Sequence, residues 1–163
     1  MRGVVSLYGQ VDLEATYYHL GQQALNPDDP EPDWDAPLPP WARRVFGSDA
    51  TRGEFEKLTV AGRLDWLMGG TPEQVPDRYA LQSPVHHVDS DCPPTLLVHG
   101  KHDQMAPISP VKKMWRHLER SDVPVVVDFL PYTDHGFDLI LPAWSPSARV
   151  AIYDLERFLA ILE

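Results

Sequence analysis

The sequence predicts an α/β fold with a partial, doubly wound parallel sheet of about three strands. Three short apolar runs carry this prediction, at residues 4–8, 95–99 and 125–130, and each is followed by a glycine or a proline, as buried strands often are. Between the second and third runs, apolar residues recur at helical spacing. Strand, helix and strand in this order predict two parallel strands joined by a right-handed crossover.

Helices should flank this sheet. Ser109, as an N-cap, and Pro110, at the first helical position, predict where the crossover helix begins. A last helix should begin near Ser145 and Pro146. The apolar faces are predicted to comprise Val111, Met114, Trp115 and Leu118 in the first helix, and Ala151, Leu155, Phe158, Leu159 and Leu162 in the second.

Residues 10–90 separate the first two strands and are too many for a plain crossover. The proline- and acid-rich residues 27–40 predict an irregular loop. Residues 41–68 have a mostly helical pattern, and residues 71–74 form a capping box that should open a short helix. We interpret residues 22–70, approximately, as a helical, cap-like insertion within one domain that spans residues 1–163. Its apolar anchors should include Leu64, Trp66 and Leu67.

Composition excludes several classes of protein. The formal net charge of -10 argues against a nucleic-acid surface, which needs clustered Lys and Arg. No stretch approaches the roughly 20 apolar residues of a membrane span. A single cysteine, Cys92, allows no internal disulfide, and no signal peptide is visible, so we expect a cytoplasmic location. Because a strand-like run begins almost at the first residue, we also expect that sequence is missing upstream.

Two loops carry residues that could take part in catalysis. The second strand is followed by a segment that ends in Asp103, and the third is followed by a segment that contains His135. Both residues therefore follow the carboxyl ends of adjacent parallel strands, where open α/β sheets bind ligands. A carboxylate and an imidazole placed there can form a hydrogen bond. The carboxylate would then fix the imidazole tautomer and stabilise the imidazolium.

These loops resemble the end of an α/β-hydrolase. The sequence H-G-x-x-D at residues 99–103, followed by a helix, a strand and D-H-G-F at residues 134–137, is similar to esterases and lipases of the hormone-sensitive-lipase and feruloyl-esterase-like groups. Residues 2–9 and 69–88 are also similar to this family, so the likeness covers nearly the whole chain, and residues 22–60 least securely. The resemblance implies Asp103 as the catalytic acid, His135 as the general base, a small-molecule ester as substrate and no cofactor.

One element of the family pattern is absent. The nucleophilic serine of the family lies in G-x-S-x-G, ahead of the strand placed at residues 3–7, and this sequence contains no such motif. The oxyanion-hole donors of the family also come earlier. Ser6, Ser48, Ser83 and Ser109 all lack the context of a nucleophile elbow. We therefore expect a C-terminal half that carries the acid and the histidine without the nucleophile, with doubtful activity alone.

Other interpretations remain open. The chain could be a non-catalytic fragment or a pseudoenzyme that pairs with an N-terminal partner chain, or with its own copies, through the exposed apolar strand at residues 3–8. It could also be the C-terminal end of a prolyl-oligopeptidase-like serine peptidase, although the long insertion favours the esterase group.

Two further features near Asp103 allow more than one interpretation. Met105 could line the substrate pocket, or it could serve only to pack its loop. His99, His102 and Asp103 follow the order H-x-x-H-D, which suggests a metal site. The sequence offers no obvious further ligand, however, and we expect no metal.

Overall fold

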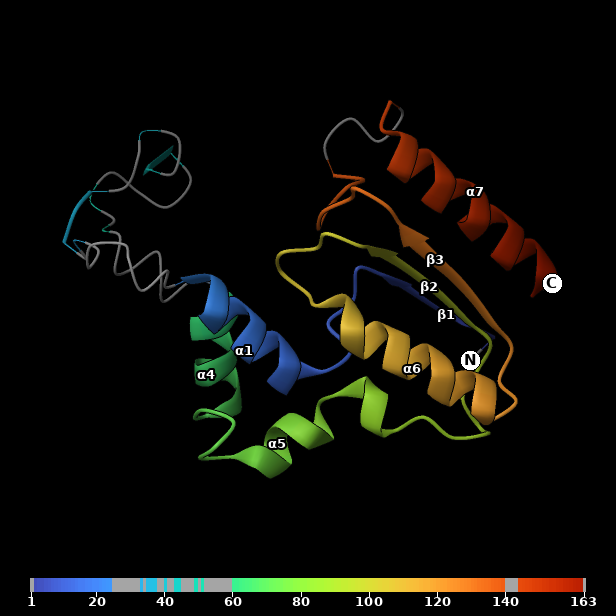
Figure 1. Ribbon diagram of the computed structural model, residues 1–163, viewed down its shortest axis with the longest axis horizontal. Helices are drawn as coiled ribbons and strands as arrows, with labels where there is room; N and C mark the ends of the chain where they lie inside the picture. Colours follow the sequence, from blue (N-terminus) through green and yellow to red (C-terminus); the bar gives the residue numbers. More distant parts are fainter. Residues whose placement is uncertain are drawn as a thin grey trace.

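A parallel sheet of three strands lies at the centre of the structure, which is a computed structural model (Figure 1). It describes residues 2–24, 33, 35–37, 40, 43–44, 49, 51, 60–139 and 144–162. The strands are β1 (Val4–Leu7), β2 (Thr95–Gly100) and β3 (Val125–Leu130), in the order β1-β2-β3. Both pairs are parallel, with Thr95 opposite Val4 on one side and Val125 on the other. The predicted α/β fold and its three parallel strands are confirmed.

Helices cover both faces of this sheet. Helix α6 (Ile108–Arg120) packs on one face and α7 (Pro146–Ile161) on the other (Figure 1). Every residue of β2 is buried, because alternate side chains enter two separate apolar clusters. Leu97 packs with Val111 and Leu118 of α6, whereas Leu96 packs with Phe158 of α7. Burying each leucine contributes about 1.5–3 kcal/mol, so the layers hold β2 firmly between them.

The predicted start of the crossover helix was two residues late. Helix α6 begins at Ile108, and Pro107 is its N-cap with extended backbone angles (φ -65°, ψ 137°). Ser109 and Pro110 instead lie within the first turn, where a proline is tolerated because no intrahelical bond requires its missing N–H.

The start of the last helix was predicted correctly. Ser145 is the N-cap of α7, and its hydroxyl accepts a hydrogen bond from the Ala148 amide at 3.3 Å. One member of the predicted apolar stripe was wrong. Leu159 is 51% exposed, because the sheet contacts the neighbouring face of the helix, which carries Ala151 and Phe158.

The described parts of the excursion between β1 and β2 include the helices α1 (Leu13–Ala24), α4 (Val60–Met68) and α5 (Pro76–Leu81) and a short 3-10 turn at Pro84–His86. A small apolar cluster of Leu64, Met68 and Tyr79 joins α4 to α5 and is covered by α1. More than half of the predicted insertion at residues 22–70, and more than half of the predicted loop at 27–40, lie outside the described residues.

Two details of this excursion differ from prediction. Trp66 and Leu67 are 83% and 65% exposed, so they do not anchor α4, whose packed face carries Leu64 and Met68 instead. The capping-box contact at residues 71–74 forms, since Gln74 Oε1 accepts a hydrogen bond from the Thr71 amide at 3.0 Å, but the helix begins only at Pro76. Among the described helices, none is long and apolar enough to cross a membrane.

Candidate active site

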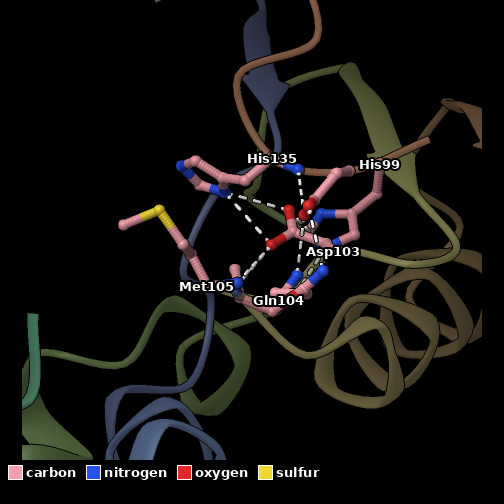
Figure 2. Close-up of polar contacts among 7 residues, drawn as sticks. His99, Asp103, Gln104, Met105 and His135 are labelled. Atoms are coloured by element: carbon pink, nitrogen blue, oxygen red, sulfur yellow. Dashed lines mark hydrogen bonds and ion pairs between the residues drawn. The ribbon is translucent and has the colours of Figure 1, made fainter. Parts of the chain in front are cut away.

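Asp103 and His135 meet at the carboxyl end of the sheet. Asp103 follows β2 by three residues, and His135 follows β3 by five. His135 Nδ1 lies 2.9 Å from Asp103 Oδ2 and 3.2 Å from Oδ1 (Figure 2). The Asp103 side chain is fully buried, whereas the His135 side chain is 22% exposed. One nitrogen of the ring thus contacts a buried carboxylate, and the other side of the ring remains partly open.

Backbone amides fix the orientation of the carboxylate. Asp103 Oδ1 accepts hydrogen bonds from the Met105 amide at 2.8 Å and from the Ala106 amide at 2.7 Å. This local turn leaves Oδ2 directed toward the His135 ring. Since an ionised carboxylate can only accept, His135 Nδ1 must be the donor, and in the neutral ring Nε2 then carries the free lone pair. That tautomer can accept a proton at Nε2.

The two loops are joined by hydrogen bonds that continue beyond the β2–β3 pairing. The Lys101 amide donates to the Leu130 carbonyl at 2.8 Å, and the His102 amide donates to the Thr133 carbonyl at 3.1 Å. Gly100 lies close to the backbone of the neighbouring loop, and a Cβ atom there would overlap the Thr133 carbonyl. A residue without a side chain is therefore needed at the end of β2.

Asp134 also connects the two loops, a role that sequence reasoning missed. Its Oδ1 accepts hydrogen bonds from the Gln104 amide at 2.9 Å and from the His135 amide at 2.7 Å, and its Oδ2 accepts one from Gln104 Nε2 at 3.3 Å. The carboxylate thereby ties the acid-bearing loop to the backbone of the histidine itself. The available signal was its position beside His135, since Asp side chains often bond to nearby backbone amides.

Tyr8 forms a wall of the site and was also missed. It follows β1 with a φ of 45°, and its amide donates to the Val98 carbonyl at 2.8 Å. Its ring lies 4.5 Å from the His135 ring and 5.4 Å from the Phe137 ring, measured between centroids. Burial, together with a hydrogen bond to the nearby Asp138 carboxylate and its charge, raises the pKa of Tyr8, so its phenol is neutral. The position of Tyr8 at the carboxyl end of a predicted strand was the sequence feature that could have indicated this role.

The H-x-x-H-D residues do not converge on one point. The His99 ring is buried and lies 3.5 Å from Asp103 Oδ2, whereas the His102 ring stacks on Tyr132 at 5.6 Å with an interplanar angle of 10°. Within the described parts of the chain, no group of three or more His, Cys, Asp or Glu side chains is arranged to hold a metal ion.

Met105 remains a candidate for contact with substrate. It is 37% exposed, and its side chain extends on the same side of Asp103 as the outward end of the His135 ring in Figure 2. Its amide meanwhile holds Asp103 Oδ1. Met105 therefore belongs to the acid-bearing loop, and its side chain is partly exposed.

No described serine forms a hydrogen bond with the His135 side chain. Ser83 is buried, where it accepts a hydrogen bond from the Leu13 amide and donates one to the Tyr79 carbonyl. Ser6 lies in β1 and Ser109 in α6, while Ser48 lies outside the described residues. Within the described structure, the side-chain hydrogen bonds of His135 are made to Asp103 alone.

Comparison with known proteins places these features in a family. A model of the prolyl oligopeptidase family matches residues 51–160, which include both site loops. The chain belongs to the prolyl oligopeptidase family. A solved structure of a puromycin-hydrolysing peptidase from Mycobacterium tuberculosis covers 98% of this chain and 18% of its own, with a TM-score of 0.51 and 19% identity. The three parallel strands and flanking helices are those of the α/β-hydrolase fold, as the resemblance implied.

Relatives of this member of the prolyl oligopeptidase family include proteins that are named as esterases. The probable carboxylic ester hydrolase LipM of Mycobacterium tuberculosis is 36% identical over 83 residues, which are 50% of this chain and 19% of LipM. Esterase LipC of the same organism is 28% identical over 131 residues, covering 68% of this chain and 30% of LipC. The chain thus spans less than a third of the length of either relative.

Proposed function

We propose that this chain supplies the acid–base pair of a serine-type carboxylic ester hydrolase, with His135 as general base and Asp103 as the residue that orients it. The single observation that carries the proposal is the 2.9 Å contact between His135 Nδ1 and the fully buried Asp103 Oδ2. Sequence similarity to two proteins named as esterases supports an ester as the substrate.

The proposed reaction follows from the tautomer of His135. Nδ1–H donates to Asp103, so Nε2 takes the proton of a serine hydroxyl as that oxygen attacks the acyl carbon. The imidazolium is stabilised by the buried carboxylate and returns the proton to the departing alkoxide. His135 then deprotonates a water molecule, which attacks the acyl-enzyme. The carboxylic acid departs, and the proton held on Nε2 returns to the serine.

The nucleophile in this proposal comes from outside these 163 residues, because the sequence contains no G-x-S-x-G. Its place would be beside β1. Within the described residues, β1 pairs with β2 on one edge only, and Val5 on this strand is 36% exposed. An unpaired strand edge is a template for another strand, so a nucleophile-bearing segment or partner chain could extend the sheet there. A clean monomer at micromolar concentration would contradict pairing between copies of this chain.

A second candidate activity is peptide hydrolysis. The match to the prolyl oligopeptidase family and the structural likeness to a peptidase favour it. The acid–base pair would act in the same way on an amide, with His135 protonating an amine leaving group instead of an alkoxide. The two activities differ in leaving group, so parallel assays on a p-nitrophenyl ester and an aminoacyl p-nitroanilide separate them.

The first test measures hydrolysis of short-chain p-nitrophenyl esters by the purified chain beside its His135→Ala variant. We expect equal rates, because the proposed nucleophile is absent. A rate that is lost in the variant would show that these residues, or their oligomer, contain a nucleophile, and would overturn that part of the proposal.

The second test is designed to supply a nucleophile by fusing this chain to esterase LipC, in place of the LipC segment that it matches. We expect ester hydrolysis that falls by at least about a thousandfold in His135→Ala and in Asp103→Asn. A chimera with a cooperative thermal transition whose rate does not depend on His135 would refute the assignment of the base.

A further inference from the structure

His99 is a buried imidazole that the proposed reaction does not use. It lies in β2, one residue before the strand ends, and is 1% exposed. Its Nε2 atom is 2.9 Å from the Ala106 carbonyl oxygen and 3.5 Å from Asp103 Oδ2 (Figure 2). A second imidazole therefore contacts the carboxylate that also contacts His135.

The protonation of His99 follows from its partner. A carbonyl oxygen can only accept a hydrogen bond, so Nε2 of His99 carries a proton. Burial lowers the pKa of His99, against the opposing effects of the Ala106 carbonyl and the Asp103 charge, so the ring is neutral near pH 7. A charged His99 would compete with His135 for Asp103 Oδ2. A neutral one adds a donor while leaving the carboxylate charge available to His135.

His99 also closes the turn that presents Asp103. The amide of Ala106 donates to Asp103 Oδ1 at 2.7 Å, and the carbonyl of the same residue accepts from His99 Nε2. Ala106 is 1% exposed, and both of its polar backbone groups thus form hydrogen bonds with residues of the site. Without His99, the buried carbonyl would lose its partner, and the turn that holds Asp103 would have to rearrange to reach another donor.

We propose that His99 is a positioning residue for the acid–base pair, which holds the turn at residues 103–106 so that Asp103 Oδ2 stays directed at His135 Nδ1. The contribution of His99 to catalysis rests on the proposed function. Its structural effect on the contact between Asp103 and His135 can be measured without any turnover.

The experiment uses NMR of the full 163-residue chain with ¹⁵N-labelled histidine. The reporter is the His135 Nδ1 proton, which is assigned as the signal lost in His135→Gln and which exchanges slowly only while it is bonded to Asp103. His99→Gln keeps an N–H group at about the reach of Nε2, whereas His99→Asn is polar but too short, and His99→Leu has no donor. His86, which is exposed, provides the matched control His86→Leu.

We expect the Nδ1 proton to exchange about tenfold faster in His99→Asn and His99→Leu, and at close to the original rate in His99→Gln and His86→Leu. Unchanged exchange in His99→Leu would overturn the proposal. Should His99→Leu fail to fold, equal exchange in the Gln and Asn variants would overturn it. Neither result depends on ester hydrolysis, so failure of this inference is distinguishable from failure of the proposed function.

Discussion

Replacing Gly100 by alanine tests how closely the loop after β2 approaches the loop after β3. The added Cβ would lie 2.8 Å from the carbonyl carbon of Thr133 and still closer to its oxygen. Ordinary contacts between carbon atoms are about 3.5–4.0 Å, so the loops must separate by about 1 Å. The obstructing atoms are backbone atoms of the neighbouring loop, which cannot rotate away as a side chain can.

The loss of stability that this separation causes follows from the contacts that it changes. Moving the loops apart by about 1 Å breaks the 3.1 Å hydrogen bond from the His102 amide to the Thr133 carbonyl, which contributes about 1 kcal/mol. Overpacking adds about 1–3 kcal/mol. We therefore expect Gly100→Ala to lower the free energy of unfolding by about 2–4 kcal/mol. For a chain of this size, the melting temperature should fall by roughly 5–15 °C.

Thermal and urea unfolding measure this effect, and Gly9→Ala is the matched control. A Cβ at Gly9 would meet the Ser6 hydroxyl, which is the end of a side chain that can turn away, so Gly9→Ala should be mild. The Nδ1 proton of His135 should also exchange faster in Gly100→Ala, because Asp103 and His135 lie on the separated loops. If Gly100→Ala melts within 2 °C of the unchanged chain, the close approach of the loops is wrong.

Three further predictions address other parts of the site and fold. Asp134→Ala removes two hydrogen bonds between the site loops and one to the His135 amide, so the His135 Nδ1 proton should exchange about tenfold faster. Asp134→Asn, which keeps an acceptor oxygen, should restore most of the protection, and equal effects of the two variants would contradict the bridging role. In the LipC chimera, Met105→Ala should raise KM about three- to tenfold with little change in kcat if its side chain contacts substrate, and an unchanged KM would argue for loop packing instead. Burial, with the neighbouring Asp154 carboxylate, raises the pKa of Asp128 to about 6, so this group destabilises the fold progressively as pH rises from about 4 to 6. Asp128→Asn should therefore stabilise the chain by about 1 kcal/mol at pH 7.5, after allowance for partial solvent screening, and by little at pH 4; equal urea midpoints at pH 7.5 would refute this.

The order of elements was predictable because it depends on local patterns. Apolar runs bounded by Gly or Pro indicated all three strands, and the helical spacing around Val111 and Leu118 indicated the crossover helix. From that order alone, Asp103 and His135 had to follow adjacent parallel strands at one edge of the sheet. The prediction that a carboxylate and an imidazole could form a hydrogen bond there agrees with their 2.9 Å separation. Their catalytic roles remain a proposal.

Details that depend on exact packing were not predictable. Spacing cannot show which face of a short helix is covered, so Trp66 was expected to anchor α4 and is instead 83% exposed. The start of α6 was misjudged because Pro107 and Pro110 can both occur near a helix N-terminus, and only the backbone path decides between them.

The sequence by itself determined the fold class and the pair of residues brought to one edge of the sheet, because strand order and loop position follow from periodicity and chain direction. Only the tertiary structure decided how that pair is held: the contact of His99 with Asp103, the bridge made by Asp134, and the Tyr8 ring against His135. These contacts join residues from different strands and loops at distances of a few ångströms. They depend on loop conformations that local sequence patterns do not specify.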